Sequence, residues 1–420
     1  MTKSSLADWL SYIESQHPAE IELGLERGNR VLAKLNLGRP NQQVITVSGT
    51  NGKGSTCAML TQYLVSQGHS VGTYTSPHFI DFNERIAINN EACNDDLICQ
   101  AFEAIEQARG DTALTYFEFS TLAALWIFHH AQLDYWVLEV GLGGRLDSVN
   151  MIDADVAVVT SIALDHMDWL GDNIEVIGRE KTGIARRDCL LISGVENPPV
   201  SIAQTSAEIG SILKQKGQDF HFKVSGDTWS WYNQEVRFDH LPIPSLPLQN
   251  AATVVAVLVY MGLAPQHEAL LNLFAHAELT GRFQHVAEQP DVYIDVAHNP
   301  EAAVELQQRL AGFECQPIAV CGMLQDKDIH SVIASLASRF ATWYCADLAG
   351  SRGAKATQLI SLISKETDTS SVSCHAFETV SQAFQAAKQQ ALMENRAIVV
   401  FGSFVTVSEY LQMAKGKHEL

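Results

Sequence analysis

Residues 43–68 combine three features that strongly limit how this chain can fold. A short β-branched run from Val44 to Val47 predicts a strand, and an apolar run ending at Gly68 predicts a helix. Between them lies a turn with three glycines, at positions 49, 52 and 54, around Lys53. Glycines let a backbone turn tightly and point its N–H groups at an anion, and the lysine adds a positive charge. The order strand, glycine turn and helix predicts a unit that holds a nucleotide phosphate.

The loop departs from the ordinary P-loop pattern, which needs a glycine six residues before the lysine and Ser or Thr directly after it. Val47 and Gly54 stand at those two places. Ser55 or Thr56 could instead serve the metal that accompanies the nucleotide. A glycine turn with only a structural role is the alternative.

Composition excludes several classes of protein. The 420 residues suffice for two or three domains, and the net charge of −20 argues against nucleic acid or an anionic membrane as partner. The eight cysteines form no C-x-x-C pair, which is typical of reduced thiols in a cytoplasmic protein. The N-terminus has no apolar core of a signal peptide. The longest uncharged apolar stretch, 251–264, is shorter than the roughly 18 residues of a membrane span.

Strand-like and helix-like runs alternate, which predicts an α/β fold with a parallel sheet. After the first unit we expect strands near 70–75, 135–140, 156–162 and 189–193, and helices near 96–109, 117–131, 174–186 and 250–261. Residues 219–238 indicate a small hairpin insertion. A second, smaller doubly wound domain has expected strands at 292–296, 318–321, 343–346 and 397–401, and helices at 300–310, 329–339, 379–392 and 404–413. The expected domains are 1–282 and 283–420.

Polar residues stand where several of these strands end, which is where open α/β sheets bind ligands. Ser76, Glu139, Asp165 and His166 occupy such positions. A glutamate in an apolar strand is costly unless it is paired or bound to a metal, so Glu139 indicates Mg²⁺; a helix-capping carboxylate is the alternative. Taken alone, His166 fits a satisfied core histidine better than a ligand. Arg145, after a glycine run, could bind a carboxylate or phosphate.

Eight motifs then occur in an order that resembles one family. They are Ser48–Ser55, Thr75–His78, Glu84–Ile86, Glu139–Asp147, Leu164–His166, Glu180–Ile184, Gly281–Phe283 and Asp295–Pro300. The chain resembles the folylpolyglutamate synthases, most of all the bacterial bifunctional dihydrofolate synthase/folylpolyglutamate synthases, which belong with the Mur ligases. The likeness covers nearly the whole chain.

The resemblance implies a Mur-ligase-like, P-loop N-terminal domain that binds ATP and pterin, and a Rossmann-like C-terminal domain that binds glutamate. Such enzymes use ATP to convert a pterin-linked carboxylate into an acyl phosphate, which the amine of L-glutamate attacks. The implied substrates are ATP, L-glutamate, dihydropteroate and reduced folates. Mg²⁺ is the implied metal, with Mn²⁺ as a substitute, and relatives imply a cytoplasmic monomer.

The resemblance also implies roles for individual residues, of which Lys53, His166 and Lys181 would be catalytic. The implied ATP contacts are Thr50, Asn51, Gly52, Lys53, Gly54, Ser55, Asn250, Arg282 and Asp295. The implied metal ligands are Ser76, Glu139 and His166, and His298 and Asn299 would bind glutamate. ATP is expected in a cleft between the domains, where it would favour closure. Lys181 matches a lysine that this family carbamylates, whereas an ordinary helix lysine is what the sequence alone favours.

Three segments of the chain match the family's pterin pocket. They contribute Ile21, Glu22 and Leu23; Thr115, Tyr116, Phe117 and Glu118; and Leu146, Asp147 and Ser148. Phe117 could stack on the flat ring, although it also shares a helical face with core leucines. Asp147 could bind the pterin's amino group. Glu22 and Met167 stand where the family pattern has Asp and Thr.

Three other functions compete with the bifunctional synthase. A folylpolyglutamate synthase without dihydrofolate synthase activity would differ in its acceptor. A cell-wall Mur ligase would carry an extra N-terminal domain ahead of the phosphate loop, which here begins at residue 49. A regulator that binds nucleotide without turnover would need no complete set of metal and ATP residues.

Overall fold

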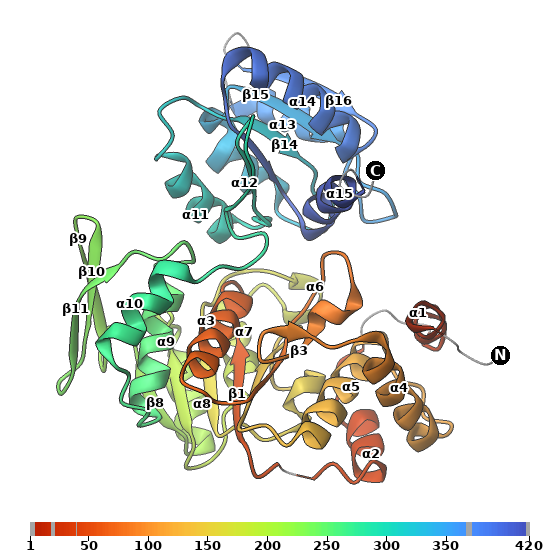
Figure 1. Cartoon of the computed structure of the whole chain (residues 1–420), viewed down its shortest axis with the longest axis vertical. Coiled ribbons are helices and arrows are strands. Elements are labelled where there is room, and N and C mark those ends of the chain that lie inside the picture. Colours follow the sequence, from red (N-terminus) through yellow and green to blue (C-terminus); the bar gives the residue numbers. More distant parts are fainter. Residues whose placement is uncertain (1–4, 18–21, 39, 367–371, 417–420) are drawn as a thin grey trace. The chain divides into compact units, whose positions relative to one another are not determined.

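The computed structural model describes residues 5–17, 22–38, 40–366 and 372–416. Contacts within the chain divide it into two compact units, Met1–Ala277 and Glu278–Leu420. The sequence places its boundary a few residues later, after Arg282. Each unit is an α/β structure built around its own mainly parallel sheet (Figure 1).

Among the described residues, the first unit forms an eight-stranded sheet in the order β4-β3-β2-β5-β1-β6-β7-β8. Its strands are β1 (Gln43–Ser48), β2 (Val71–Tyr74), β3 (Ile86–Ile88), β4 (Glu91–Ala92), β5 (Tyr135–Glu139), β6 (Val156–Val159), β7 (Leu190–Ser193) and β8 (Ile212–Gln215). The six strands from β2 to β8 in this order are parallel, and β3 and β4 extend the sheet antiparallel at one edge. The strands β1, β2, β5, β6 and β7 confirm the predicted parallel sheet.

Helices cover both faces of this sheet. Side chains alternate between faces along a strand, so Val44 of β1 packs toward the cluster formed with α4 and α5. The helix α3 packs against α9 and α10 on the other side of β1 (Figure 1). The helices are α1 (Leu6–Ser15), α2 (Glu26–Lys34), α3 (Lys53–Ser66), α4 (Asp95–Arg109), α5 (Tyr116–Ala131), α6 (Met167–Leu170), α7 (Ile174–Thr182), α8 (Val200–Ile209), α9 (Leu248–Tyr260) and α10 (His267–His276). The described residues of this unit also form two 3₁₀ turns, η1 (Phe82–Arg85) and η2 (Ser148–Met151).

Two predicted elements of the first unit differ from the structure. The helix expected over 174–186 ends at Thr182, and a tight turn follows in which the Ala185 N–H bonds the Thr182 carbonyl. Gly183 lies against Arg145 in this turn, where a larger side chain would collide. The predicted hairpin gains a third strand: β9 (His221–Ser225), β10 (Thr228–Tyr232) and β11 (Arg237–Pro242) form an antiparallel sheet. Trp229 and Trp231 of β10 are fully buried, which anchors this sheet to the unit.

The described part of the second unit contains a six-stranded sheet in the order β12-β13-β17-β14-β15-β16. Its strands are β12 (Gln284–Ala287), β13 (Val292–Ile294), β14 (Ile318–Cys321), β15 (Thr342–Ala346), β16 (Ser373–Phe377) and β17 (Ile398–Phe401), and only the pairing of β12 is antiparallel. One face packs against α11 (Pro300–Leu310), α12 (Ile329–Leu336) and α13 (Ala356–Glu366). The other contacts α14 (Val380–Glu394) and α15 (Phe404–Lys415), and η3 (Ala337–Arg339) follows α12. The second doubly wound sheet is confirmed, while β12, β16 and α13 were not predicted.

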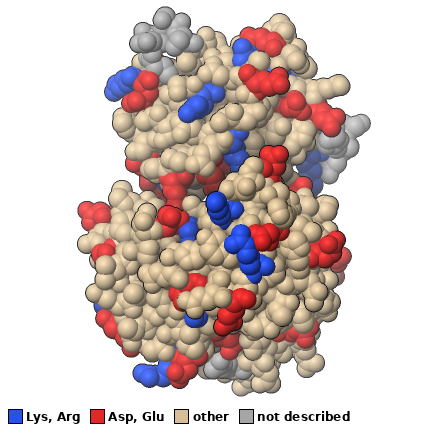
Figure 2. Space-filling view, turned by 90° about the vertical axis from the view of Figure 1, so that its left-hand side faces the viewer, with Lys and Arg blue, Asp and Glu red and all other residues tan. Residues whose placement is uncertain are grey.

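The surface agrees with the acidic composition. On the face in Figure 2, acidic side chains are scattered over each unit and are interspersed with basic ones. None of the described helices has both the length and the apolar character needed to cross a bilayer.

Candidate active site

The phosphate loop lies where the sequence places it, between β1 and α3. Gly52 precedes the helix with a φ of 81°, a left-handed conformation that favours glycine. The Thr56 N–H donates to the Gly52 carbonyl at 3.0 Å and so begins the helical ladder. The N–H groups ahead of it have no intrahelical acceptor and carry the positive end of the helix dipole. The start of α3 is therefore arranged to receive an anion.

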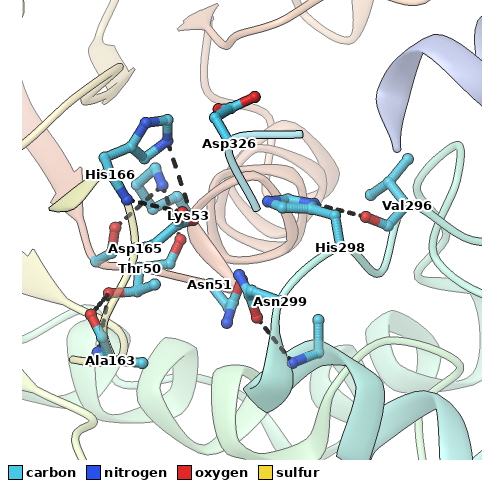
Figure 3. Close-up of polar contacts among 12 residues, drawn as sticks. Thr50, Asn51, Lys53, Ala163, Asp165, His166, Val296, His298, Asn299 and Asp326 are labelled. Atoms are coloured by element: carbon cyan, nitrogen blue, oxygen red, sulfur yellow. Dashed lines mark hydrogen bonds and ion pairs between the residues drawn. The ribbon is translucent and has the colours of Figure 1, made fainter. Parts of the chain in front are cut away.

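The segment 160–163, which follows β6, holds the first half of this loop in place. The Thr50 N–H donates to the Ser161 carbonyl at 2.9 Å, and the Ala163 N–H donates to the Thr50 hydroxyl at 3.0 Å. The Asn51 N–H donates to the Ser161 hydroxyl at 3.0 Å, and the Thr160 hydroxyl donates to the Asn51 carbonyl at 2.6 Å. The close-up in Figure 3 shows the contact between Thr50 and Ala163. These polar groups, assigned to ATP from the sequence, thus fix the shape of the loop itself.

Two lysines converge on one carbonyl of the loop. The Lys53 ammonium donates to the Gly49 carbonyl at 3.0 Å and to the Thr50 carbonyl at 3.1 Å. The ammonium of Lys181, near the end of α7, donates to the same Gly49 carbonyl at 2.8 Å, and its side chain is buried. The sequence predicts both residues for the site, and the structure brings them together. Two cations around one oxygen concentrate positive charge beside the predicted phosphate position.

Asn250, at the start of α9, lies directly against the loop although it is almost 200 residues away in the chain. A methyl group added at Gly52 would overlap the Asn250 amide. Asn250 is buried, so its amide forms one wall of the loop. The predicted nucleotide residues Asn250 and Gly52 therefore share one location.

The metal ligands predicted from β5 and from the segment after β2 also meet. Glu139 pairs with Val47 of β1 in the sheet, which places its carboxylate beside the beginning of the phosphate loop. The Ser76 N–H donates to that carboxylate at 3.1 Å. Glu139 is 5% exposed, and a buried carboxylate of this kind is costly without compensating charge.

The hydroxyls at the start of α3 differ in their partners. The Thr56 hydroxyl donates back to the Gly52 carbonyl at 2.9 Å. The Ser55 hydroxyl is buried and has no hydrogen-bond partner among the described residues. Of the two hydroxyls that the sequence offered, Ser55 is the one whose oxygen remains for a ligand. Its oxygen and the Glu139 carboxylate are donors of the type that Mg²⁺ and Mn²⁺ prefer, so these residues fit a hard divalent cation.

His166 stands in a different environment from a core histidine. It has a left-handed backbone (φ 51°), its side chain is 37% exposed, and its Nε2 lies 3.9 Å from the Asp165 carboxylate. Figure 3 shows His166 on the same side of the loop as Lys53. Over the described residues, no group of three or more His, Cys, Asp or Glu side chains could hold a metal by itself. A metal held by the predicted ligands Ser76, Glu139 and His166 would therefore need further oxygens, from a hydroxyl, water or phosphate.

The Arg145 side chain, which the sequence suggested for binding a carboxylate or phosphate, is bonded to a carboxylate of the chain itself. Its guanidinium donates to the Glu180 carboxylate at 2.9 and 2.7 Å, and its backbone N–H donates to the Glu180 carbonyl. This contact holds the glycine run that follows β5 against the end of α7, next to Lys181. Gly144 permits this approach, because an added methyl group would press on the Glu180 and Lys181 backbone.

The described parts of the three predicted pterin segments lie together. The Gly24 N–H donates to the Leu146 carbonyl at 3.1 Å, which joins the N-terminal segment to the segment after the glycine run. The Phe117 ring packs directly on Gly141, where a side chain would collide with it. Ile21 lies outside the described residues. Glu22 is exposed and Leu23 is partly buried beside it.

Several side chains of these segments already have structural partners. Thr115 and Glu118 form the capping box of α5, with the Thr115 N–H donating to the Glu118 carboxylate at 2.8 Å. The Tyr116 ring lies 5.4 Å from the Arg85 guanidinium and packs inward. Ser148 is buried at the start of η2.

Asp147 is a buried carboxyl in the same region. It accepts the Leu142 N–H at 2.8 Å and the Val149 N–H at 2.9 Å. Burial raises the pKa of Asp147 to about 6, although these N–H groups and Lys53 act in the opposite direction. Asp147 therefore shapes the glycine run and lies within electrostatic reach of Lys53.

Arg27 is a residue of this region that the sequence did not reveal. It lies in the first turn of α2 and forms ion pairs with Glu22 and with Glu118 of α5. Nothing in the local sequence distinguishes it from other surface arginines, because Glu118 is 91 residues away. Its only sequence signal is its position directly after the predicted pterin segment.

In the second unit, Arg282 and Asp295 lie close to each other. The Asp295 carboxylate accepts the Phe283 N–H at 2.8 Å and the Ala297 N–H at 2.7 Å. Burial raises the pKa of Asp295, and the Arg282 charge acts to lower it. The Arg282 guanidinium lies 5.7 Å from the centre of the Phe404 ring, a distance typical of a cation–π contact.

His298 lies against the same Phe404 ring as Arg282. Its ring lies 6.4 Å from the Phe404 ring, and its Nδ1 lies 2.7 Å from the Val296 carbonyl. Asn299 caps α11 by accepting the Ala302 N–H at 3.0 Å, and Figure 3 shows His298 and Asn299 on the same turn of chain. Glu305, which the sequence did not single out, lies one and a half turns into α11. Burial and the Asp295 charge raise the pKa of Glu305 to about 7.

Comparison with known protein families agrees with this arrangement. Residues 47–226 match the Mur ligase middle domain, and residues 281–404 match the Mur ligase glutamate ligase domain. The chain is 45% identical to the dihydrofolate synthase/folylpolyglutamate synthase of Escherichia coli strain K12 over 98% of this chain and 96% of that protein. It is 38% identical to the Haemophilus influenzae protein of the same name, over 97% of each chain.

Solved structures show the same relationship. E. coli FolC in complex with DHPP and ADP matches with a TM-score of 0.93 and 44% identity over 99% of both chains. The bifunctional folylpolyglutamate synthase/dihydrofolate synthase of Yersinia pestis, complexed with AMPPNP and Mn ion, matches with a TM-score of 0.91 and 44% identity over 98% of both chains. The sequence resemblance and the predicted two-unit α/β fold are both confirmed. The chain belongs to the bacterial bifunctional dihydrofolate synthase/folylpolyglutamate synthase family of Mur ligases.

Proposed function

We propose that this protein uses ATP to ligate L-glutamate to dihydropteroate, which makes dihydrofolate, and to reduced folates, which lengthens their glutamate tail. The observation that carries the proposal is the 45% identity to the E. coli bifunctional enzyme over 98% of the chain. The converging residues of the phosphate loop support it, because Lys53, Lys181, Glu139 and Asn250 come from four separate elements to one loop.

The reaction begins with a carboxylate that is too stable to accept an amine. Transfer of the ATP γ-phosphoryl group to this carboxylate gives an acyl phosphate, whose phosphate is a good leaving group. The glutamate amine then attacks the carbonyl carbon, and ADP and phosphate are released. Phosphoryl transfer depends mainly on positioning and charge neutralisation, which Lys53 and the N–H groups at the start of α3 provide.

A divalent cation, Mg²⁺ or Mn²⁺, would neutralise phosphate charge and orient the phosphate oxygens when bound. We assign it to Ser76, Glu139 and His166, with Ser55 as a further oxygen donor. The fit of these donors supports the assignment, since Glu139 is buried and the Ser55 hydroxyl has no partner among the described residues. The Glu139 carboxylate also accepts the Ser76 N–H, which keeps the predicted ligands next to each other.

Lys181 is proposed to carry a carbamate. Its neutral amine would add to CO₂ with loss of a proton, so that a cation becomes an anion. The contact of two ammonium groups with the Gly49 carbonyl supports this, because removing one cation relieves their repulsion. Replacement of Lys181 by Ala should abolish activity without recovery, and full activity of that variant would refute the assignment.

We assign the substrates to the two domains as the sequence predicts. We assign residues 1–282 to ATP and pterin binding and residues 283–420 to glutamate binding. Arg282 and Asp295 would contact the nucleotide, and His298 and Asn299 would bind glutamate. The contact of both Arg282 and His298 with the Phe404 ring supports a shared role for these groups.

The decisive experiment supplies purified protein with ATP, Mg²⁺, dihydropteroate and L-glutamate and measures ADP release and dihydrofolate formation. We expect both products, and no ADP when glutamate or the pterin is left out. Tetrahydrofolate in place of dihydropteroate should also be extended. Turnover of tetrahydrofolate alone would identify a folylpolyglutamate synthase without the first activity, and no turnover of either acceptor would refute the proposal.

Two further assignments complete the proposal. We propose a cytoplasmic protein, since all eight cysteines are free, as expected in a reducing compartment. We also propose a monomer, which light scattering of the purified protein tests directly.

A further inference from the structure

Arg27 reaches two segments that are far from it in the sequence. Its Nε donates to the Glu118 carboxylate of α5 at 3.1 and 3.4 Å, and one terminal nitrogen donates to the Glu22 carbonyl at 2.9 Å. Its other terminal nitrogen forms an ion pair with the Glu22 carboxylate. One guanidinium fork thus binds both the backbone and the side chain of Glu22 while it holds α5.

Glu118, the partner of Arg27 on α5, is held in place by burial and by a second hydrogen bond. Glu118 is 1% exposed, and its second role is to accept the Thr115 N–H in the capping box. A buried carboxylate that loses its cation is strongly destabilised, so Arg27 and Glu118 depend on each other. The planar fork of arginine allows this several-fold contact, which a lysine ammonium does not reproduce.

The same short segment is attached on its other side to the chain after the glycine run. Gly24 donates its N–H to the Leu146 carbonyl at 3.1 Å, and Asp147 and Ser148 follow directly. Gly24 has a φ of 147°, which favours glycine at this contact. Residues 22–24 are therefore held between α5 and Leu146, with Arg27 as the ionic link.

These three segments are the ones to which the proposed function assigns the pterin. A flat ring bound between segments of this kind loses affinity when one of them moves, because the binding energy must then also order the loop. We propose that Arg27 is a positioning residue that sets the affinity for the pterin end of the acceptor by holding residues 22–24 in place. The inference rests on the proposed function, and Arg27 acts through Glu22 and Glu118 without touching the substrate.

The test compares Arg27→Ala and Arg27→Lys with a matched control, Arg30→Ala, which removes an exposed arginine from the same helix. We expect Arg27→Ala to raise the KM for dihydropteroate and tetrahydrofolate at least tenfold, while the KM for ATP changes less than twofold. Arg27→Lys should give an intermediate increase, and Arg30→Ala should match the wild type. Glu118→Gln provides the reciprocal change, and its effect should not add to that of Arg27→Ala.

Two measurements without turnover separate this inference from the proposed function. Direct binding of dihydropteroate should weaken at least tenfold in Arg27→Ala, and amide hydrogen exchange at residues 22–27 should become faster. Equal pterin affinity in the variant and the wild type overturns the inference alone. A wild type that binds pterin but releases no ADP overturns the proposed function alone, and a wild type that binds no pterin overturns both. If Arg27→Ala does not fold, Arg27→Lys and Glu118→Gln decide by the same measurements.

Discussion

The phosphate loop of the first unit and the Arg282–His298 region of the second unit are both predicted ligand sites, but they are built from different groups. The phosphate loop follows β1, and His298 follows β13, so both regions extend beyond the carboxyl end of a parallel strand. The loop presents positive charge with backbone N–H groups and with two lysines on the Gly49 carbonyl. The second region uses side chains: Arg282 and His298 both lie against the Phe404 ring, and the Asp295 carboxylate accepts the N–H of Phe283. A site made of backbone should fail abruptly when its conformation changes, whereas one made of packed side chains should weaken by degrees.

The largest effect is expected from Gly52→Ala. The added methyl group would overlap the Asn250 amide at a φ of 81°, so the loop must move. We expect kcat/KM for ATP to fall about 1,000-fold, which corresponds to roughly 4 kcal/mol. ADP release measures this. The matched control is Gly68→Ala, at a φ of 86° with open space around it, which should cost about 1 kcal/mol of stability and leave kcat/KM unchanged. Retention of a tenth of the activity by Gly52→Ala contradicts the comparison.

Glu139→Gln tests the carboxylate beside the loop. The neutral amide keeps the shape but removes the charge that we assign to the metal, so kcat should fall about 100-fold, or about 2.7 kcal/mol. The concentration of Mg²⁺ or Mn²⁺ needed for half-maximal activity should rise in the same variant. Glu91→Gln, at an exposed position of the same sheet, should change neither quantity. An unchanged metal requirement in Glu139→Gln would remove Glu139 from the metal site.

Glu305→Gln should change the pH dependence of stability in the second unit. Burial and Asp295 raise the pKa of Glu305 from 4.5 to about 7, so the folded protein holds this proton at pH values where the unfolded chain has released it. Stability is therefore fully present below about pH 4.5 and is lost as the pH rises through about 7. Glutamine imitates the protonated form, so the variant should be more stable than the wild type at pH 8 by about 1–3 kcal/mol and equal to it at pH 4.5. Urea unfolding across this range measures the difference, and a constant offset at every pH would contradict it.

The smallest effect is expected from Phe404→Leu. Loss of the ring removes a cation–π contact worth about 0.5–2 kcal/mol, so the KM for ATP should rise about 2- to 30-fold. The KM for glutamate should also rise, because His298 packs on the same ring. Phe384→Leu, which removes a buried ring packed on Tyr410 in the same unit, should leave both values unchanged. A complete loss of activity in Phe404→Leu would show that this region is as intolerant as the phosphate loop.

Much of the fold followed from the sequence because its signals are local. The strands β1, β5, β6 and β7 are short, mostly apolar and separated by helical runs, so the parallel sheet was predictable. The strands β8, β12 and β16 were missed because they lie at or near sheet edges, where the side chains are mixed and only the neighbouring strand selects the conformation.

The sequence identified which residues lie at the site, but it did not show which hydrogen bonds each of them forms. The motifs named Lys53, Glu139 and Lys181, and the structure brings them to one loop. The sequence could not show that Thr50 and Asn51 bond to residues 160–163, since hydrogen bonds across about 110 residues leave no local pattern. Arg27 escaped notice for the same reason, because its partner Glu118 lies on a distant helix.

The bonds from Thr50 and Asn51 to residues 160–163 also bear on how the protein is made. The phosphate loop lies early in the chain, yet its shape depends on the segment after β6, which the ribosome adds more than 100 residues later. A nascent chain in which residues 160–163 have not yet left the ribosome therefore lacks the hydrogen bonds that fix the shape of the phosphate loop. We therefore expect the chain to bind nucleotide only after the central strands of the first sheet have assembled.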